Sequence, residues 1–173
     1  MPDNNLLELA EQPFLEGLPV EHLKLLVKGA KSVKFKVGDR ILTEGGPANL
    51  FYLLLEGSVE LEASVLKGQP VPIQTLGAGD LLGWSWLFPP FCWHFDARAA
   101  TPVKAAKFPA KQVRELCEQN HDLGYALMKR VSVALIQRLQ SARCDAVVRQ
   151  GGGGPAVTAR QAPKARARKS GNR

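Results

Sequence analysis

The sequence lacks a long hydrophobic run, which excludes the simplest kinds of membrane protein. A helix that spans a bilayer needs roughly twenty mostly apolar residues, whereas the clearest apolar run here, Leu50 to Leu55, has six. A secretory signal is also missing, because Glu8, Glu11 and Glu16 interrupt the region where its apolar core would lie. These absences predict a soluble, cytoplasmic protein that makes no contact with a membrane.

Cysteine is scarce as well, and the residues that bind metals are few and scattered. The chain of 173 residues holds three cysteines and three histidines, which are Cys92, Cys117, Cys144, His22, His94 and His121. Their spacing provides no basis for a disulfide framework or a zinc site, and three thiols are too few for an iron–sulfur cluster. Because HExxH, P-loop, GxGxxG and nucleophile-elbow motifs are also absent, we predict a protein that is not an enzyme.

Acidic residues are missing from one end of the chain, and this asymmetry explains its net charge of +7. From Gly151 to Arg173 there are six basic residues and no acidic one, which leaves 17 basic against 16 acidic residues in the rest. This segment has one large apolar residue, Val157, and cannot bury enough surface to offset the entropy of folding. We predict a disordered basic tail over 151–173. It serves either as a solubilising extension or as a weak contact for nucleic acid.

The body of the sequence begins with a helical period and changes to the two-residue period of strands. Apolar residues at helical spacing predict short N-terminal helices over 1–31. From Ser32 onward, apolar residues alternate with polar ones between glycine-containing turns. Examples of this alternation are Val33, Phe35 and Val37, and then Val59, Leu61 and Ala63. Short strands without intervening long helices predict an antiparallel sandwich or barrel over 32–108.

A helical period returns over 109–150. Pro109 to Gln119 predicts one helix, and Asp122 to about Val148 predicts a longer one. The apolar residues of the longer helix form more than one stripe, and they include Leu123, Leu127, Met128, Val131, Val133, Leu135, Ile136, Leu139 and Ala142. A helix that is apolar on more than one side needs more than one partner. Either both sides pack on the chain's own barrel, or one side meets a second subunit and makes a homodimer through 122–148.

Turn residues recur through the strand region in a characteristic series. The segments are Gly38-Asp39-Arg40-Ile41-Leu42, Glu44-Gly45, residues 49–54, Glu56-Gly57-Ser58-Val59, Gly79-Asp80-Leu81-Leu82-Gly83, Arg98-Ala99-Ala100-Thr101 and Val103-Lys104-Ala105. This series resembles the cyclic-nucleotide-binding domain over roughly residues 14–145. The resemblance implies a mainly β fold, an antiparallel jelly-roll (cupin-like) β-barrel with flanking helices, followed by a long C-terminal helix. Residues from Gly151 onward are too few and too polar for a helix-turn-helix domain, so we expect a stand-alone module.

In that family the ligand lies in a cassette, which the resemblance places at 79–105. A short helix offers backbone N–H groups to the cyclic phosphate, an arginine adds charge-assisted hydrogen bonds, and an acidic residue after a glycine accepts from the ribose hydroxyl. The resemblance therefore implies a ligand site made of Gly83, Trp84, Ser85, Arg98, Ala99, Ala100 and Thr101. Arg98 stands at the arginine position. The implied ligand is a cyclic nucleotide or another small anion.

The cassette departs from the family pattern at Trp84, which stands where the acidic residue is expected. An indole donates one hydrogen bond and accepts none, and its ring would occupy the place of the sugar. Half of the chain's aromatic residues lie in this segment, namely Trp84, Trp86, Phe88, Phe91, Trp93 and Phe95. They either fill the pocket or line an altered one. Arg98 also has a second interpretation, an internal salt bridge with Asp96.

The sequence leaves four functions open. The leading hypothesis is a regulatory or sensor module with an altered or degenerate ligand cassette, acting through a protein partner. The alternatives are a genuine cyclic AMP or cyclic GMP sensor, a haem or redox sensor, and a structural interaction protein with a filled pocket. The haem hypothesis depends on Cys92 and His94, because haem-binding sensors of this superfamily use a cysteine and a histidine in this region.

Overall fold

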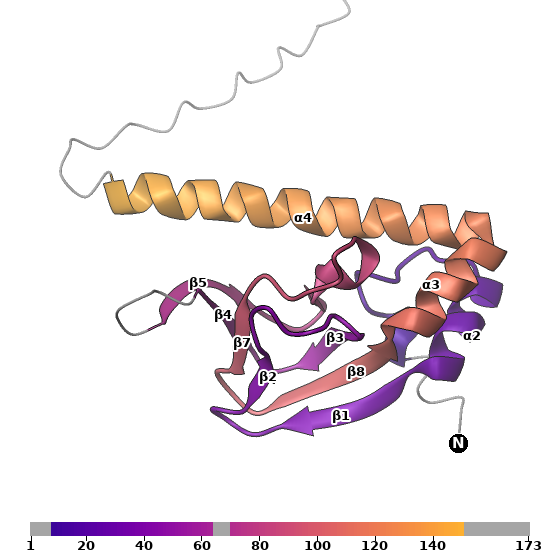
Figure 1. The fold of residues 1–173 in the computed structure, drawn as a ribbon, viewed down its shortest axis with the longest axis horizontal. Coiled ribbons are helices and arrows are strands. Elements are labelled where there is room, and N and C mark those ends of the chain that lie inside the picture. Colours follow the sequence, from indigo (N-terminus) through magenta and orange to yellow (C-terminus); the bar gives the residue numbers. More distant parts are fainter. Residues whose placement is uncertain (1–7, 64–69, 151–173) are drawn as a thin grey trace, which may run out of the picture.

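The computed structural model describes residues 8–63 and 70–150, with side chains to residue 144. Two antiparallel sheets lie beneath one long helix, and two shorter helices cover one end of the sheets (Figure 1). The predicted basic tail over 151–173 lies outside the described residues, and so does the beginning of the predicted N-terminal helical region.

Each of the two sheets has four strands. The first has the strand order β1 (Lys31–Phe35), β8 (Val103–Pro109), β3 (Leu50–Glu56) and β6 (Leu81–Leu82). The second has the order β2 (Arg40–Leu42), β7 (Asp96–Ala99), β4 (Val59–Ala63) and β5 (Val71–Leu76). All paired strands are antiparallel, and several neighbours are distant in sequence, such as β1 and β8. This topology fits a jelly roll and confirms the predicted fold class.

The alternation of apolar and polar residues decides which side chains enter the core. On β4, Val59 and Leu61 are buried, as their two-residue spacing predicts. On β3, residues 51–54 are all buried, because this strand is covered on both faces. The prediction differs at Val37, which is 62% exposed. The strand ends before it, and Gly38 turns the chain there with a φ of 86°, so Val37 belongs to a turn.

The flanking helices are α2 (Val20–Gly29), α3 (Ala110–Gln119) and α4 (His121–Gln150). Asn120 separates α3 from α4, and its side-chain Oδ1 accepts a hydrogen bond from the N–H of Leu123 at 3.0 Å. This bond satisfies one of the free donors at the start of α4. Over residues 8–63 and 70–150, no helix combines the length and the apolar character that crossing a membrane requires.

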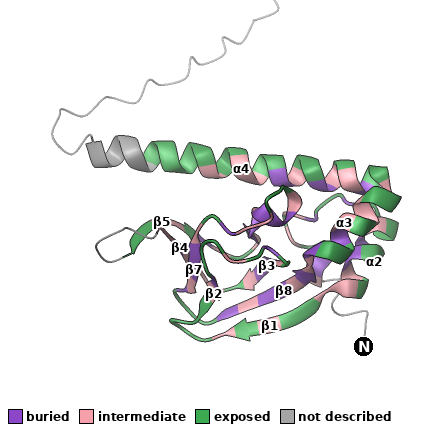
Figure 2. Cartoon of the chain, in the orientation of Figure 1, coloured by how far each residue is buried: buried purple, intermediate pink, exposed green. Residues whose placement is uncertain are grey.

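The two sides of α4 differ in their surroundings. Leu123, Leu127 and Val131 are buried against the rest of the core. The opposite side carries exposed apolar residues, which are Tyr125, Met128, Ile136 and Leu139. Figure 2 shows this difference as a buried lower edge and an exposed upper surface of the helix. One protomer therefore covers only one apolar side of α4.

Candidate functional site

The loop that carries the predicted ligand site starts with a sharp turn at Gly83. This glycine follows β6 and has a φ of 86°, in the left-handed region. A Cβ added here would lie 2.6 Å from Cζ3 of the Trp93 ring, closer than atoms can approach without displacement. Glycine thus allows the backbone to pass directly against this indole. A short 3-10 helix, η1 (Trp84–Leu87), follows it.

Trp86 anchors this short helix to the core. Its side chain is 0% exposed and its ring stacks on Phe51 of β3, with the ring centroids 4.4 Å apart. Phe51 stacks in turn on Phe108 of β8 at 4.9 Å. The three rings form one continuous stack, which holds η1 against the first sheet.

Helix α3 holds the same loop from outside through Arg114. The guanidinium Nη1 donates a hydrogen bond to the carbonyl of Trp86 at 2.6 Å. Its Cζ lies 4.4 Å from the ring centroid of Phe91, in a cation–π contact. One side chain thereby connects α3 to two points of the loop, which restricts its movement.

Trp84, Ser85 and His94 of the same loop contact one another. The rings of Trp84 and His94 stack with centroids 5.0 Å apart. The hydroxyl of Ser85, a buried residue, lies 2.9 Å from Nδ1 of the same imidazole. His94 therefore joins the two sides of the loop by a ring contact and a hydrogen bond.

These contacts leave little space beside Gly83. The remaining cavity has a volume of about 20 Å³, and its lining includes Gly83, Trp84, Ser85, Trp93, His94 and Arg138. Sites for drug-sized ligands commonly measure about 300–1,000 Å³. In this conformation aromatic side chains, those of Trp84, Trp93 and Phe95, line the remaining space next to the turn.

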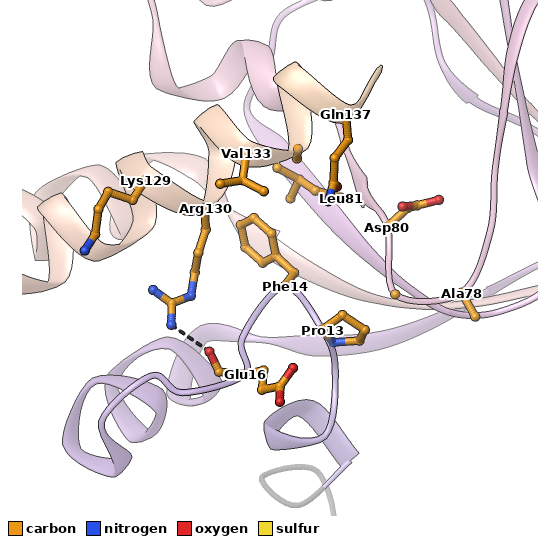
Figure 3. A pocket seen from close by; sticks show the side chains of 12 residues that line it. Pro13, Phe14, Glu16, Ala78, Asp80, Leu81, Lys129, Arg130, Val133 and Gln137 are labelled. Atoms are coloured by element: carbon orange, nitrogen blue, oxygen red, sulfur yellow. Dashed lines mark hydrogen bonds between the residues drawn. The ribbon is translucent and has the colours of Figure 1, made fainter. Parts of the chain in front are cut away.

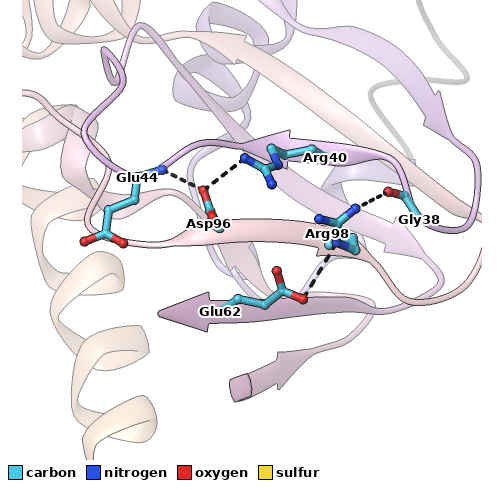
Figure 4. Close-up of polar contacts among 6 residues, drawn as sticks. All are labelled: Gly38, Arg40, Glu44, Glu62, Asp96 and Arg98. Atoms are coloured by element: carbon cyan, nitrogen blue, oxygen red, sulfur yellow. Dashed lines mark hydrogen bonds and ion pairs between the residues drawn. The ribbon is translucent and has the colours of Figure 1, made fainter. Parts of the chain in front are cut away.

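Arg98 lies elsewhere, on the outer face of the second sheet. Ala97 and Ala99, its neighbours on β7, are buried, and strand alternation directs the arginine to the opposite side. Its Nη1 donates to the carbonyl of Gly38 at 2.8 Å, and its Nε lies 3.7 Å from Oε1 of Glu62 (Figure 4). Arg98 does not line the cavity beside Gly83.

The ion pairs of this sheet also differ from the expected pair of Arg98 with Asp96. Oδ1 of Asp96 lies 3.9 Å from Nη1 of Arg40 and accepts a hydrogen bond from the N–H of Glu44 at 2.9 Å. Asp96 is buried, and these contacts supply partners for its charge. The partner that the structure gives to Arg98 is Glu62.

The other residues of the predicted arginine segment have backbone or side-chain contacts within the fold. The N–H of Ala99 donates to the carbonyl of Asp39, and the N–H of Ala100 donates to that of Ser58, both at 2.9 Å. The hydroxyl of Thr101 accepts from the N–H of Ser58 at 2.8 Å. Residues 98–101 therefore do not meet residues 83–85 at the cavity. Their contact with a ligand stays a prediction.

The arginine that does reach the cavity is Arg138 of α4, which sequence reasoning missed. Its Nη2 donates a hydrogen bond to the carbonyl of Leu81, on β6. Burial lowers the pKa of this guanidinium, and the negative charge of Asp80 offsets part of that effect. The sequence held one indication of this position. Arg138 follows Val131 by two helical turns, and this spacing places it on the buried side of α4.

A second, larger cavity lies between α4, the turn before β6 and the loop that precedes α2. Its volume is about 490 Å³, and Phe14 and Val133 form part of its wall (Figure 3). Two acidic and two basic residues line it, which are Glu16, Asp80, Lys129 and Arg130. Their formal charges cancel, and Arg130 already donates to the carbonyl of Glu16 at 2.8 Å. This groove has no excess of positive charge for a phosphate.

The two residues of the haem hypothesis, Cys92 and His94, each have contacts within the loop. The thiol of Cys92 lies 3.6 Å from the carbonyl of Pro90, and His94 contacts Trp84 and Ser85. Within the described part of the chain, no three histidine, cysteine or acidic side chains come together in an arrangement that could hold a metal ion.

The chain is similar to several known proteins. A putative cyclic nucleotide-binding protein from Geobacter metallireducens GS-15 has a solved structure with 31% identity and a TM-score of 0.70, and the match covers 80% of this chain and 97% of that one. A cAMP-dependent protein kinase regulatory subunit from Emericella nidulans is 34% identical over 57% of this chain and 23% of its own length.

A third similar protein is Glutaminase 1 from Bradyrhizobium diazoefficiens, with 31% identity over 76% of this chain and 21% of its own length. The chain thus spans less than a quarter of these two curated relatives. The family model described as the cyclic nucleotide-binding domain matches residues 32–120, which include all eight strands except the first residue of β1. The chain belongs to the cyclic nucleotide-binding domain family.

Proposed function

We propose that the chain is a non-enzymatic regulatory module whose cyclic-nucleotide cassette is degenerate. The observation that carries this proposal is the small volume, about 20 Å³, of the cavity beside Gly83. A cyclic nucleotide has more than twenty non-hydrogen atoms and needs a pocket many times larger. The module then regulates through its surface or through a smaller ligand.

The chemistry of the lining supports the same proposal. Among the described residues that line this cavity there is no carboxylate, so no charged acceptor is available for the ribose hydroxyl. Trp84 stands at the acidic position of the cassette, and an indole N–H can only donate. Arg98, at the expected arginine position, is bound to Gly38 and Glu62 on the outer face of the sheet.

Calorimetry with cyclic AMP and cyclic GMP tests this proposal. We expect cyclic AMP to bind about ten to a hundred times more weakly than to a family member that keeps the glutamate, because a hydrogen bond to a charged group contributes about 1.5–3 kcal/mol. Trp84→Glu should recover only part of the affinity, because Trp93 and the Ser85–His94 pair would still fill the cavity. Tight binding of cyclic AMP by the unmodified protein would instead establish a genuine sensor.

The same preparation distinguishes a haem sensor from a structural interaction protein. A bound haem would show a strong absorption band at about 400 nm. A protein with neither haem absorption nor nucleotide binding would fit a structural interaction protein with a filled pocket, for which the small volume of the cavity is also the supporting observation.

We also propose that the module forms a homodimer through α4. The side of this helix that faces away from the core carries Tyr125, Ile136 and Leu139, and Leu139 is 64% exposed. Tyr125 and Ile136 are eleven positions apart, about three helical turns, and Leu139 follows Ile136 by three, so the three residues lie on one side of the helix. Exposed apolar residues gathered on one side of a helix are best covered by a partner, and a second copy presents the same residues in an isologous contact.

Replacing Ile136 and Leu139 together with glutamate should convert a dimer into a monomer at micromolar concentration, because it would bury four charges in an isologous interface. Ile136 is a better position than Leu135, which is partly buried against the chain's own core. Sedimentation gives the oligomeric state, and Gln140→Glu with Ser141→Glu adds the same charge at exposed positions as a control. A monomeric wild type, or a dimeric double variant, would contradict the proposal.

A further inference from the structure

Arg138 brings a positive charge from α4 to the cavity beside Gly83. The helix turns its buried side, with Leu127 and Val131, toward the core, and Arg138 lies two turns after Val131 in the same direction. Its guanidinium reaches the carbonyl of Leu81 and lines the cavity together with Ser85 and His94. The charge therefore lies where a ligand of the cassette would be recognised.

This charge is incompletely compensated. A guanidinium has five N–H donors, and the contact described for Arg138 is the hydrogen bond to the Leu81 carbonyl. Among the residues that the structure describes, no carboxylate forms an ion pair with it. Asp80, the acid whose charge acts on it, accepts a hydrogen bond from the N–H of Gly77 at 2.7 Å. A cation that is partly withdrawn from water, as this half-buried guanidinium is, favours the binding of a counter-ion.

The size of the cavity restricts what that counter-ion can be. A space of about 20 Å³ accommodates one water-sized group or slightly more. We propose that Arg138, with the hydroxyl of Ser85, binds a small monovalent anion in this cavity, such as chloride or formate. This inference rests on the proposed function, since it names the class of ligand that a cassette closed to nucleotides still accepts.

The position of the arginine separates this site from the one that the sequence indicates. Arg98 is the arginine of the cassette motif, but it is paired with Glu62 on the outer face. Arg138 connects the cavity to α4 and to β6 at the same time. An anion bound there would add hydrogen bonds between the helix and the loop, and would link occupancy of the cavity to the position of α4.

Titration of the full chain with sodium chloride and sodium formate tests the site. The background is sodium gluconate at constant ionic strength, because gluconate is too large for the cavity. Trp84 and Trp93 line the cavity, so intrinsic tryptophan fluorescence should change in a saturable manner. Line broadening in chloride NMR is an independent measure of the bound ion. We expect both signals in the wild type.

Variants on one helix identify the arginine responsible. Arg138→Gln should weaken the binding of both anions about ten-fold or more, since it removes a charge-assisted hydrogen bond. Arg138→Lys should keep most of the affinity because it keeps the charge. Arg143→Gln, at an exposed position of the same helix, should bind as the wild type does and serves as the matched control.

Two outcomes would overturn the inference. The first is a wild-type protein with no saturable signal by either method, which needs no variant and holds even if Arg138→Gln fails to fold. The second is a folded Arg138→Gln protein that binds the anions as tightly as the Arg143→Gln control. Failure of the proposed function has a different signature, which is tight binding of cyclic AMP in calorimetry. The two results can therefore be told apart.

Discussion

Trp86→Ala should lower the free energy of unfolding by about 3–5 kcal/mol, the usual loss for a large aromatic side chain removed from a core. The ring is 0% exposed and stacks on Phe51 at 4.4 Å, so its removal leaves a cavity between η1 and the first sheet. The same change removes the anchor of the loop that holds Ser85. We therefore expect the binding of chloride and formate in the cavity beside Gly83 to weaken as well.

Urea denaturation monitored by circular dichroism measures this loss. Phe88→Ala is the matched control, because it removes an aromatic ring two residues later whose side chain is 39% exposed. That variant should lose less than about 1 kcal/mol, as expected for an exposed position. Equal losses in the two proteins would show that the stack of Trp86 on Phe51 does not anchor the loop.

Gly57→Ala should be the second most damaging change, with a loss of about 2–5 kcal/mol. Gly57 has a φ of 85°, and an added Cβ would lie 2.1 Å from the carbonyl oxygen of Pro102. The left-handed conformation costs an L-residue about 1–2 kcal/mol, and steric overlap in a packed region adds about 1–3 kcal/mol. Because the nearby atom belongs to the backbone, a side-chain rotation cannot relieve the contact.

Gly38→Ala separates the two contributions. Gly38 has almost the same φ, 86°, but no heavy atom lies within 4 Å of the position that its Cβ would take. This variant should lose only the conformational part, about 1–2 kcal/mol. Thermal and urea denaturation of both variants give the comparison. If Gly38→Ala were as unstable as Gly57→Ala, the approach of Pro102 would have no part in the effect.

The strands and helices could be predicted from local patterns because their periods differ. Val59 and Leu61 alternate with polar residues and are buried, as a half-buried strand requires. Val37 broke this pattern because the turn at Gly38 begins earlier than the alternation ends. Hydrophobic periodicity shows which residues can face a core, but it locates the end of a strand poorly.

The candidate site could be predicted only in part. The cluster of aromatic residues after Gly83 indicated a filled or altered pocket, and the structure places Trp84 and Trp93 around a small cavity. The arginine was assigned from its place in a motif. Whether a residue on β7 faces inward depends on strand register, and this register turns Ala97 and Ala99 inward and Arg98 outward.

The sequence by itself determined the family, the order of strands and helices, and the concentration of aromatic side chains in the cassette, because these depend on composition, spacing and turn residues along the chain. Only the tertiary structure decided which arginine lines the cavity beside Gly83. Arg98 is fifteen positions from Gly83 in the sequence but lies on the outer face of the second sheet. Arg138 is much farther away in the sequence, and yet it lines the cavity beside Gly83. The physical reason is that the packing of α4 on the two sheets is set by the sum of many long-range contacts, and no local pattern records which side chains such packing brings together.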